Sequence, residues 1–105
     1  MREYLQENGY RIVREDMVFE DGKYYPMMKV VEGSDTPYTQ VELEYGRYLL
    51  RSAHPVLKQF LKKEAETLNK ILEGLVRQSS VRAEERREEI RHKISTVEAV
   101  LAEYY

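Results

Sequence analysis

A repeating pattern of seam positions in residues 55–105 constrains the fold of this chain more than any other feature. Along two stretches the positions recur at alternating steps of four and three residues, which is the pattern of a coiled-coil seam. Residues 78–81 between the stretches are too few for anything but a reversal, so the helices should be antiparallel neighbours. Each helix would be about 35 Å long. The seam positions are Leu57, Leu61, Glu64, Leu68, Ile71 and Leu75, then Ala83, Arg87, Ile90, Ile94, Val97, Leu101 and Tyr104.

The composition excludes several classes of protein. The chain has 105 residues and no cysteine, so it has neither a disulfide framework nor a thiolate metal site. Its two histidines, His54 and His92, are too few to build a zinc site by themselves. No apolar run approaches the ~18 residues that a membrane span needs, and no signal peptide is recognisable. We therefore expect one domain or part of one, in the cytoplasm and without a membrane partner.

The first ten residues predict a short helix that precedes a β-hairpin. Residues 2–8 read as the last turns of a helix, and Gly9 stands where a left-handed C-cap is wanted. A helix this short is marginal alone, so it resembles the end of a longer one. Residues 10–20 and 23–31 are rich in β-branched and aromatic side chains, and Asp21-Gly22 between them is a strong hairpin signal.

Two features of this hairpin need an explanation. Glu15 and Asp16 break the alternation of the first strand and indicate a bulge or an exposed step. Pro26 cannot donate to a ladder and should face an edge or a bulge. Two apolar strands alone are marginal, so the hairpin needs a partner surface. The helices, a second copy of the chain, or the remainder of a larger sheet are the three alternatives.

A loop and a short helix connect the hairpin to the long helices. Gly, Ser, Asp and Pro cluster in residues 32–38 and indicate a loop. Thr39 and Glu42 form a capping-box pattern that opens a helix over residues 40–52, with Gly46 inside it. Pro55 then stands at a first helical position. The predicted fold class is α+β, with residues 1–33 as helix end and hairpin, 34–54 as linker loop and short helix, and 55–105 as the antiparallel coiled-coil arm.

No catalytic or cofactor-binding motif is present. The sequence has no G-x-G-x-x-G, Walker loop, G-x-S-x-G or H-E-x-x-H. His54 reads as an exposed helix cap, and His92 lies on a charged helix face, where a solvated or RNA-facing role fits better than a ligand role. Glu64 stands at an apolar seam position, and the alternatives for it are a buried acid, a side chain that extends to solvent, and a pair with Arg87. We assign no catalytic, cofactor-binding or metal-binding residue.

The positive charge is concentrated in the helical half. Residues 1–40 carry five Lys/Arg and eight Asp/Glu, whereas residues 51–93 carry eleven Lys/Arg and seven Asp/Glu. One cluster lies near the start of the first long helix, and a second, which includes Lys93, lies in the second helix. Both a solubilising face with i,i+4 pairing and a surface that contacts RNA phosphates without reading sequence fit this pattern.

Several short motifs, in this order, resemble the C-terminal part of the bacterial TrmK family, the S-adenosylmethionine-dependent tRNA (adenine(22)-N(1))-methyltransferases. The resemblance covers nearly the whole chain, but it has departures. Arg47 stands where many members have proline after the glycine, and Pro26 and Met27 replace a usual glutamate and isoleucine. The matching residues are Leu5, Asn8, Gly9, Tyr10 and Ile12, then Asp21, Gly22, Lys23 and Tyr25, then Tyr38, Glu42, Tyr45, Gly46, Leu49 and Leu50.

The resemblance implies a non-catalytic part of a larger enzyme. In such a methyltransferase the S-adenosylmethionine site precedes this region, so the chain itself would hold no cofactor. The hairpin would form the edge of a Rossmann-like sheet, and the helical arm would bind tRNA. The implied tRNA contacts are Arg47, Arg51, Lys58, Lys62, Lys63, Arg82, Arg86, Arg87 and Arg91.

Two other hypotheses compete with this one. The first is a stand-alone interaction module that forms a homodimer or higher oligomer through its exposed hairpin. The second is a small enzyme.

Overall fold

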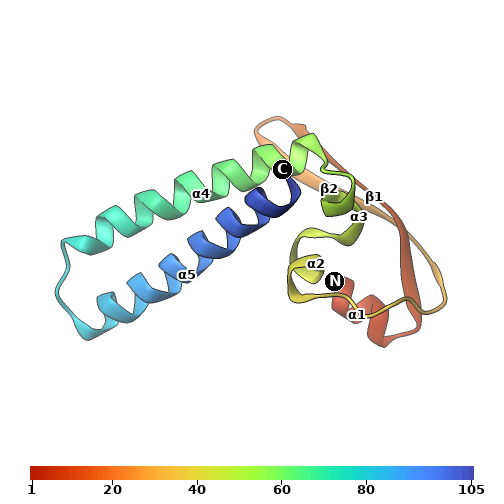
Figure 1. The fold of residues 1–105 in the computed structure, drawn as a ribbon, viewed down its shortest axis with the longest axis horizontal. Helices are drawn as coiled ribbons and strands as arrows, with labels where there is room; N and C mark the ends of the chain where they lie inside the picture. The colour runs from red at the N-terminus through yellow and green to blue at the C-terminus, as the bar shows by residue number, and fades with distance from the viewer. The chain divides into compact units, whose positions relative to one another are not determined.

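The fold begins with a short helix and a β-hairpin and ends with two long helices (Figure 1). The computed structural model describes all residues from 1 to 105, and the α+β class is confirmed. The chain forms two units, Met1–Leu57 and Lys58–Tyr105. The elements are α1 (Arg2–Glu7), β1 (Tyr10–Glu20), β2 (Lys23–Glu32), α2 (Gln40–Tyr45), α3 (Arg47–Arg51), α4 (Pro55–Val76) and α5 (Val81–Tyr104).

The predicted hairpin is confirmed and forms a two-stranded antiparallel sheet. Its pairing runs from Tyr10 opposite Glu32 to Glu20 opposite Lys23. The turn residues Asp21 and Gly22 have φ values of +50° and +78°. A type I′ turn requires positive φ at both central positions, and its twist matches that of the strands it joins. The local Asp-Gly signal therefore determines the register from the turn as far as the pair of Arg14 and Lys29.

The irregularity in β1 lies at Val13, and not at the predicted Glu15 and Asp16. Ile12 pairs with Val30 and Arg14 pairs with Lys29, so Val13 is the extra residue of a bulge. A bulge shifts the alternation of side chains by one residue. Ile12 and Glu15, three residues apart, therefore face the same side of the strand. The break in alternation at Glu15 is real, but its cause lies two residues earlier.

One face of the hairpin packs on the short helices. Both α1 and α3 contact β1. On that face Ile12 and Met17 are buried, and the Glu15 side chain is fully enclosed. Phe19, on the same face nearer the turn, is 51% exposed, and Met27, which pairs with Asp16 on the opposite face, is 47% exposed. The helices of the same unit thus supply part, though not all, of the partner surface that the apolar hairpin needs.

The single helix predicted over residues 40–52 is wrong, because Gly46 separates α2 from α3. Gly46 has φ +101° and is the C-cap of α2 as well as the N-cap of α3. A Cβ atom at this position would lie 2.5 Å from the Oε2 atom of Glu15. The glycine therefore provides both the unusual backbone conformation and the space for a neighbouring carboxylate. The predicted capping box of Thr39 and Glu42 is confirmed at the start of α2.

The second unit consists of α5 and most of α4, which run in opposite directions (Figure 1). Seam residues along both helices are buried, among them Leu61, Leu68, Ile90 and Val97, whereas Ile71 is 38% exposed. The hydroxyl of Ser80 accepts a hydrogen bond from the Ala83 amide at 3.1 Å and so caps α5. None of the helices is both long and apolar enough to cross a membrane.

Candidate nucleic-acid interface

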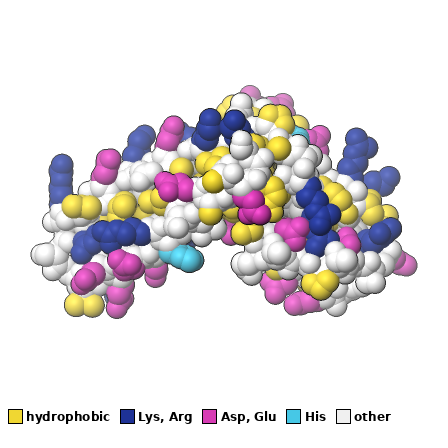
Figure 2. Space-filling model, viewed as in Figure 1, with side chains coloured by type: hydrophobic (Ala, Val, Ile, Leu, Met, Phe, Trp, Pro, Cys, Tyr) yellow, Lys and Arg dark blue, Asp and Glu magenta, His cyan; other side chains and the backbone are white.

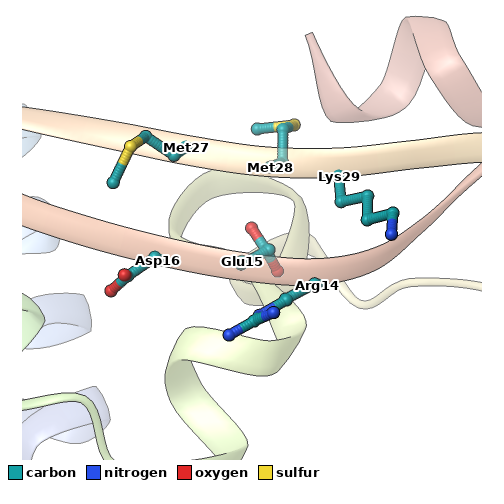
Figure 3. Close-up of a pocket in the computed structure, with 6 residues that line it drawn as sticks. All are labelled: Arg14, Glu15, Asp16, Met27, Met28 and Lys29. Carbon is teal, nitrogen blue, oxygen red and sulfur yellow. The ribbon is translucent and has the colours of Figure 1, made fainter.

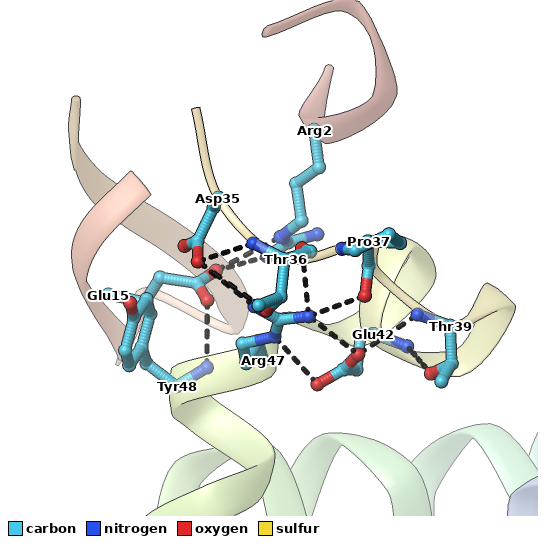
Figure 4. Close-up of polar contacts among 9 residues, drawn as sticks. All are labelled: Arg2, Glu15, Asp35, Thr36, Pro37, Thr39, Glu42, Arg47 and Tyr48. Atoms are coloured by element: carbon cyan, nitrogen blue, oxygen red, sulfur yellow. Dashed lines mark hydrogen bonds and ion pairs between the residues drawn. The ribbon is translucent and has the colours of Figure 1, made fainter. Parts of the chain in front are cut away.

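Arg47 is the most completely hydrogen-bonded side chain of the first unit (Figure 4). Its Nε donates to Glu42 Oε2 at 2.9 Å, and one terminal nitrogen donates to Thr36 Oγ1 at 2.7 Å. The other terminal nitrogen donates to the Pro37 carbonyl at 2.7 Å and to the Thr36 carbonyl at 3.2 Å. The guanidinium also lies 3.9 Å from the centroid of the Tyr38 ring. These contacts attach the loop before α2 to the start of α3.

This environment removes Arg47 from the predicted tRNA contacts. Its side chain is only 4% exposed, and its donors are used within the chain. The hydrogen bond from Arg47 holds the pKa of the Glu42 carboxyl below its ordinary value, and the same bond raises the pKa of Arg47. Burial raises the pKa of the nearby Tyr38 hydroxyl to about 12. A phosphate cannot reach a guanidinium that is enclosed in this way, so we correct this assignment.

A second buried ion pair was missed by sequence reasoning. Arg2 of α1 contacts Glu15 of β1, with 2.9 Å between the terminal nitrogen of Arg2 and Glu15 Oε2. The other carboxylate oxygen of Glu15 accepts from the Tyr48 amide in the first turn of α3 at 3.0 Å. Arg2 also donates to the carbonyls of Leu43 and Glu44 at the end of α2. Arg2 and Glu15 thus join four elements. The only sequence signal of this pair was Glu15 itself, a charged residue that breaks the alternation of β1.

His54 caps α4, as predicted, but it is half-buried rather than exposed, and it also contacts the hairpin. Its Nδ1 accepts from the Val56 amide at 3.2 Å, so the proton of the neutral ring is on Nε2. That Nε2 lies 2.7 Å from Asp16 Oδ1. Hydrogen bonds from the Met17 amide and from His54 lower the pKa of Asp16. The contact joins the residue before α4 to β1, so the His54 ring has a structural role.

The remaining predicted RNA contacts lie in different environments. Arg51 is exposed at the end of α3. Lys62, Lys63 and Arg82 are exposed and make no ion pair within the chain. Lys58 is half-buried, with its Nζ 6.0 Å from the centroid of the Tyr105 ring.

The arginines of α5 are more engaged with the chain itself. Arg86 pairs with Glu89 at 3.2 Å, and Arg91 pairs with Glu88 at 2.7 Å. Figure 2 shows Lys and Arg side chains standing among Asp and Glu side chains on the visible face of the helix pair. Exposed pairs of this kind are weak, so these arginines remain available to a polyanion.

Arg87 has a structural role at the end of the helix pair. In place of the predicted pairing with Glu64, it donates to the carbonyls of Leu75 and Gln78 at 2.7 Å and 2.8 Å. The last carbonyls of a helix have no partner within it, and an arginine is a suitable cap for them. Arg87 is half-buried and holds the turn between α4 and α5 closed. Of the nine predicted contacts it is, after Arg47, the one most engaged by the chain.

An open hollow lies on the hairpin, with a volume of about 340 Å³ (Figure 3). Its lining has mixed charge, and the structure contains no group of three side chains that could hold a metal ion. The lining residues are Arg14, Glu15, Asp16, Met27, Met28 and Lys29.

Neither the surroundings of Gly46 nor the hollow on the hairpin fits S-adenosylmethionine. A glycine-based cradle needs free space above the glycine, and at the buried Gly46 the Glu15 carboxylate and the Arg2 guanidinium occupy that space. The hollow on the hairpin is open to solvent, and no glycine lines it. We therefore derive no step of a reaction through the cofactor.

A protein-family model covers almost the whole chain. The model described as "TrmK: tRNA (adenine(22)-N(1))-methyltransferase" matches residues 1–99. No curated protein matches the chain.

Solved structures share the fold across nearly all of the chain. An uncharacterized protein of Listeria monocytogenes serotype 4b is 31% identical with a TM-score of 0.82, over 95% of this chain and 45% of its own. A candidate tRNA (m1A22) methyltransferase of Streptococcus pneumoniae, solved in complex with S-adenosyl-L-methionine, is 31% identical with a TM-score of 0.75, over 95% and 41%. A protein of the NADB-Rossmann superfamily from Streptococcus agalactiae is 27% identical with a TM-score of 0.76, over 95% and 41%. The chain thus spans less than half the length of these structures.

Proposed function

The chain belongs to the tRNA (adenine(22)-N(1))-methyltransferase family, and we propose that it is the C-terminal, tRNA-binding part of such an enzyme. The observation that carries the proposal is the set of exposed cations on the helix pair, of which Lys63 and Arg82, for example, have no ion-pair partner in the chain. An unpaired surface cation can replace the counterions of a phosphate at little cost. The tRNA backbone is therefore the partner whose chemistry fits this surface.

The proposal assigns methyl transfer to a different part of the enzyme. One similar structure was solved with S-adenosyl-L-methionine, and its chain is more than twice as long as the segment matched here. The proposal therefore places the cofactor in the part of such an enzyme that this chain does not span. The role of the helix pair is to hold the tRNA by its phosphates, which fixes orientation without reading sequence. The proposed site of action is the cytoplasm, where tRNA is modified.

The hairpin supports the same assignment. Its end near the turn leaves Phe19, Tyr25 and Met27 exposed by 51%, 45% and 47%. An isolated two-stranded sheet is marginal, and large exposed apolar side chains signal a missing partner surface. We propose that β1 and β2 are edge strands of a larger Rossmann-like sheet, which a longer chain would complete.

The direct test is tRNA binding by the chain as a function of salt. Labelled tRNA is titrated with the chain, and fluorescence anisotropy gives the dissociation constant at several salt concentrations. We expect the logarithm of the association constant, the inverse of this dissociation constant, to fall linearly with log salt, with a slope of about −0.7 to −0.9 for each phosphate contacted. Absence of binding, or binding that does not change with salt, would contradict the proposal. Incubation of the chain with tRNA and S-adenosylmethionine should transfer no methyl group.

A stand-alone module that self-associates is the second candidate, and the exposed apolar end of the hairpin favours it. Two copies that cover this end would remove the same surface from water. Sedimentation over a range of protein concentrations distinguishes the candidates. A monomer at every concentration contradicts self-association, whereas a dimer that a Phe19→Lys substitution converts to monomer supports it.

A further inference from the structure

The two flanks of the α4–α5 pair differ in charge. A flank is defined here by its place relative to the seam, because side chains three, four and seven residues apart lie on the same side of a helix. In an antiparallel pair, the residues that directly follow Leu57 and Tyr104 fall on the same flank. The contact between Lys58 and the Tyr105 ring confirms this register. We call this side the mixed flank and the opposite side the basic flank.

The basic flank carries an excess of positive charge. Its cations are the exposed residues Lys63 and Lys70 of α4 and Arg82, Arg86 and Lys93 of α5. Its acidic residues are Glu89 and Glu103, which leaves an excess of three positive charges. The mixed flank carries equal numbers of each sign, namely Lys58, Lys62 and Arg91 with Glu84, Glu88 and Glu98.

The cations of the two flanks also differ in their contacts within the chain. On the mixed flank, Arg91 is paired with Glu88 at 2.7 Å, and Lys58 lies near the ring of Tyr105. On the basic flank, Arg86 is the one cation with an ion pair in the chain, to Glu89 at 3.2 Å. The other four cations make no such pair. The charge of the basic flank is therefore both larger in total and less neutralised.

The spacing on the basic flank suits an extended polyanion. Lys63 and Lys70 are seven residues apart on α4, and Arg86 and Lys93 are seven apart on α5. At 1.5 Å per residue each pair is separated by about 10 Å along its helix. Because the helices are antiparallel, the two rows run beside each other, with Arg82 continuing the α5 row toward the turn. A phosphate chain can thus be contacted at successive points by rigid elements.

We infer that the basic flank, including Lys70 and Lys93, is the face of the helix pair that contacts the tRNA phosphates, and that the mixed flank faces away. The inference rests on the proposed function and sharpens it. It adds two residues to the predicted contacts and removes Lys58, Lys62 and Arg91 from the contact face. The mixed flank is not repelled by RNA, but it offers no net attraction.

The test compares two double variants with the same change in net charge. Lys70→Glu with Lys93→Glu alters the basic flank, and Lys62→Glu with Arg91→Glu alters the mixed flank. All four side chains are exposed, so both variants should keep the helical circular dichroism of the parent. For the basic-flank variant we expect tRNA affinity to fall about tenfold or more and the salt slope to shrink by about 2. The mixed-flank variant should change affinity about twofold at most.

The possible outcomes distinguish a failure of the proposed function from a failure of the inference. If the parent chain does not bind tRNA, the proposed function fails and the inference falls with it. If the parent binds and both variants lose affinity equally, the proposed function stands and the inference is overturned. Protection of lysines from acetylation by bound tRNA gives an independent readout. Lys63, Lys70 and Lys93 should be protected and Lys58 and Lys62 should not, and the reverse pattern would also overturn the inference.

Discussion

The two units of the chain use the same types of charged residue in opposite ways. In the first unit, Arg47 and Arg2 are enclosed, and each joins elements through several hydrogen bonds. In the second unit, Lys63, Lys70 and Lys93 stand exposed without ion pairs, and buried apolar seam residues such as Ile90 supply the packing. Buried charged side chains therefore join the elements of the first unit, whereas most charged side chains of the second unit are exposed and Arg87 caps its turn. A count of arginines and lysines does not distinguish these roles, but burial does.

The difference has an energetic consequence. A buried charge that loses its partner keeps the full desolvation cost, so removal of one member is expensive. An exposed charge is already hydrated and contributes little to stability wherever it pairs. Substitutions of the buried charged residues should therefore destabilise the first unit, whereas substitutions of exposed charged residues on the helix pair should leave the second unit folded but altered in binding.

The largest expected effect is the removal of the Arg47 guanidinium. Arg47→Ala leaves the Glu42 carboxylate, whose side chain is only 10% exposed, without its ionic partner. We expect the first unit to lose about 3–5 kcal/mol of stability. Amide hydrogen exchange measures this, because it reports protection of each unit separately. The control is Arg51→Ala on the same helix, which is exposed and should cost less than about 0.5 kcal/mol. Equal costs for the two would contradict a structural role for Arg47.

A smaller or equal effect is expected from the seam of the second unit. Ile90 is fully buried, so Ile90→Ala should cost about 2–5 kcal/mol through lost burial and the cavity that remains. Ile71 occupies a seam position but is 38% exposed, and its replacement by alanine should cost clearly less. Denaturant unfolding followed by helical circular dichroism compares the two. If Ile71→Ala proved as costly as Ile90→Ala, the seam would extend further toward the turn than its burial indicates.

The sequence predicts those parts of the fold whose causes are local. Asp21-Gly22 and the Thr39–Glu42 box act within a few residues, and both were confirmed. The break at Gly46 was missed because its cause is distant. The Glu15 carboxylate occupies the space where a side chain would be, and Glu15 lies on another element. Helix propensity indicates only that a glycine is unfavourable inside a helix.

The candidate site shows the same limit. Arg47 was assigned to RNA because it is a basic residue close in sequence to a basic helix, like the other predicted contacts. In the structure, two of its hydrogen-bond acceptors are the backbone carbonyls of Thr36 and Pro37. A sequence does not show which residues will provide a backbone carbonyl as a hydrogen-bond acceptor. Lys70 and Lys93, in contrast, were within reach of sequence reasoning. Sorting the cations by their place relative to the heptad seam would have grouped them with Lys63.

The acid stability of the first unit provides a third test. The pKa of Glu42 in the folded chain lies below its ordinary value of 4.5, because Arg47 donates to the carboxylate. The unfolded chain therefore takes up the proton first as pH falls. The stabilisation is complete above pH 4.5 and is lost below it. Glu42→Gln should lower stability at neutral pH and weaken the acid-side decline seen by hydrogen exchange. The exposed Glu66→Gln should leave that decline unchanged, and an unchanged decline in Glu42→Gln would contradict the account.

The smallest expected effect concerns exposed charges within the first unit, and it tests whether burial rather than the unit decides their role. Arg14 and Lys29 are cross-strand partners of like charge on the exposed side of the hairpin. Lys29→Glu creates an opposite pair and should stabilise the hairpin by about 0.2–1 kcal/mol. Lys23 faces Glu20, so Lys23→Glu should destabilise it by a similar amount. Both shifts should diminish at high salt, because exposed charges are screened. A salt-independent change of several kcal/mol at either position would show that charge in this unit acts through the fold even where it is exposed.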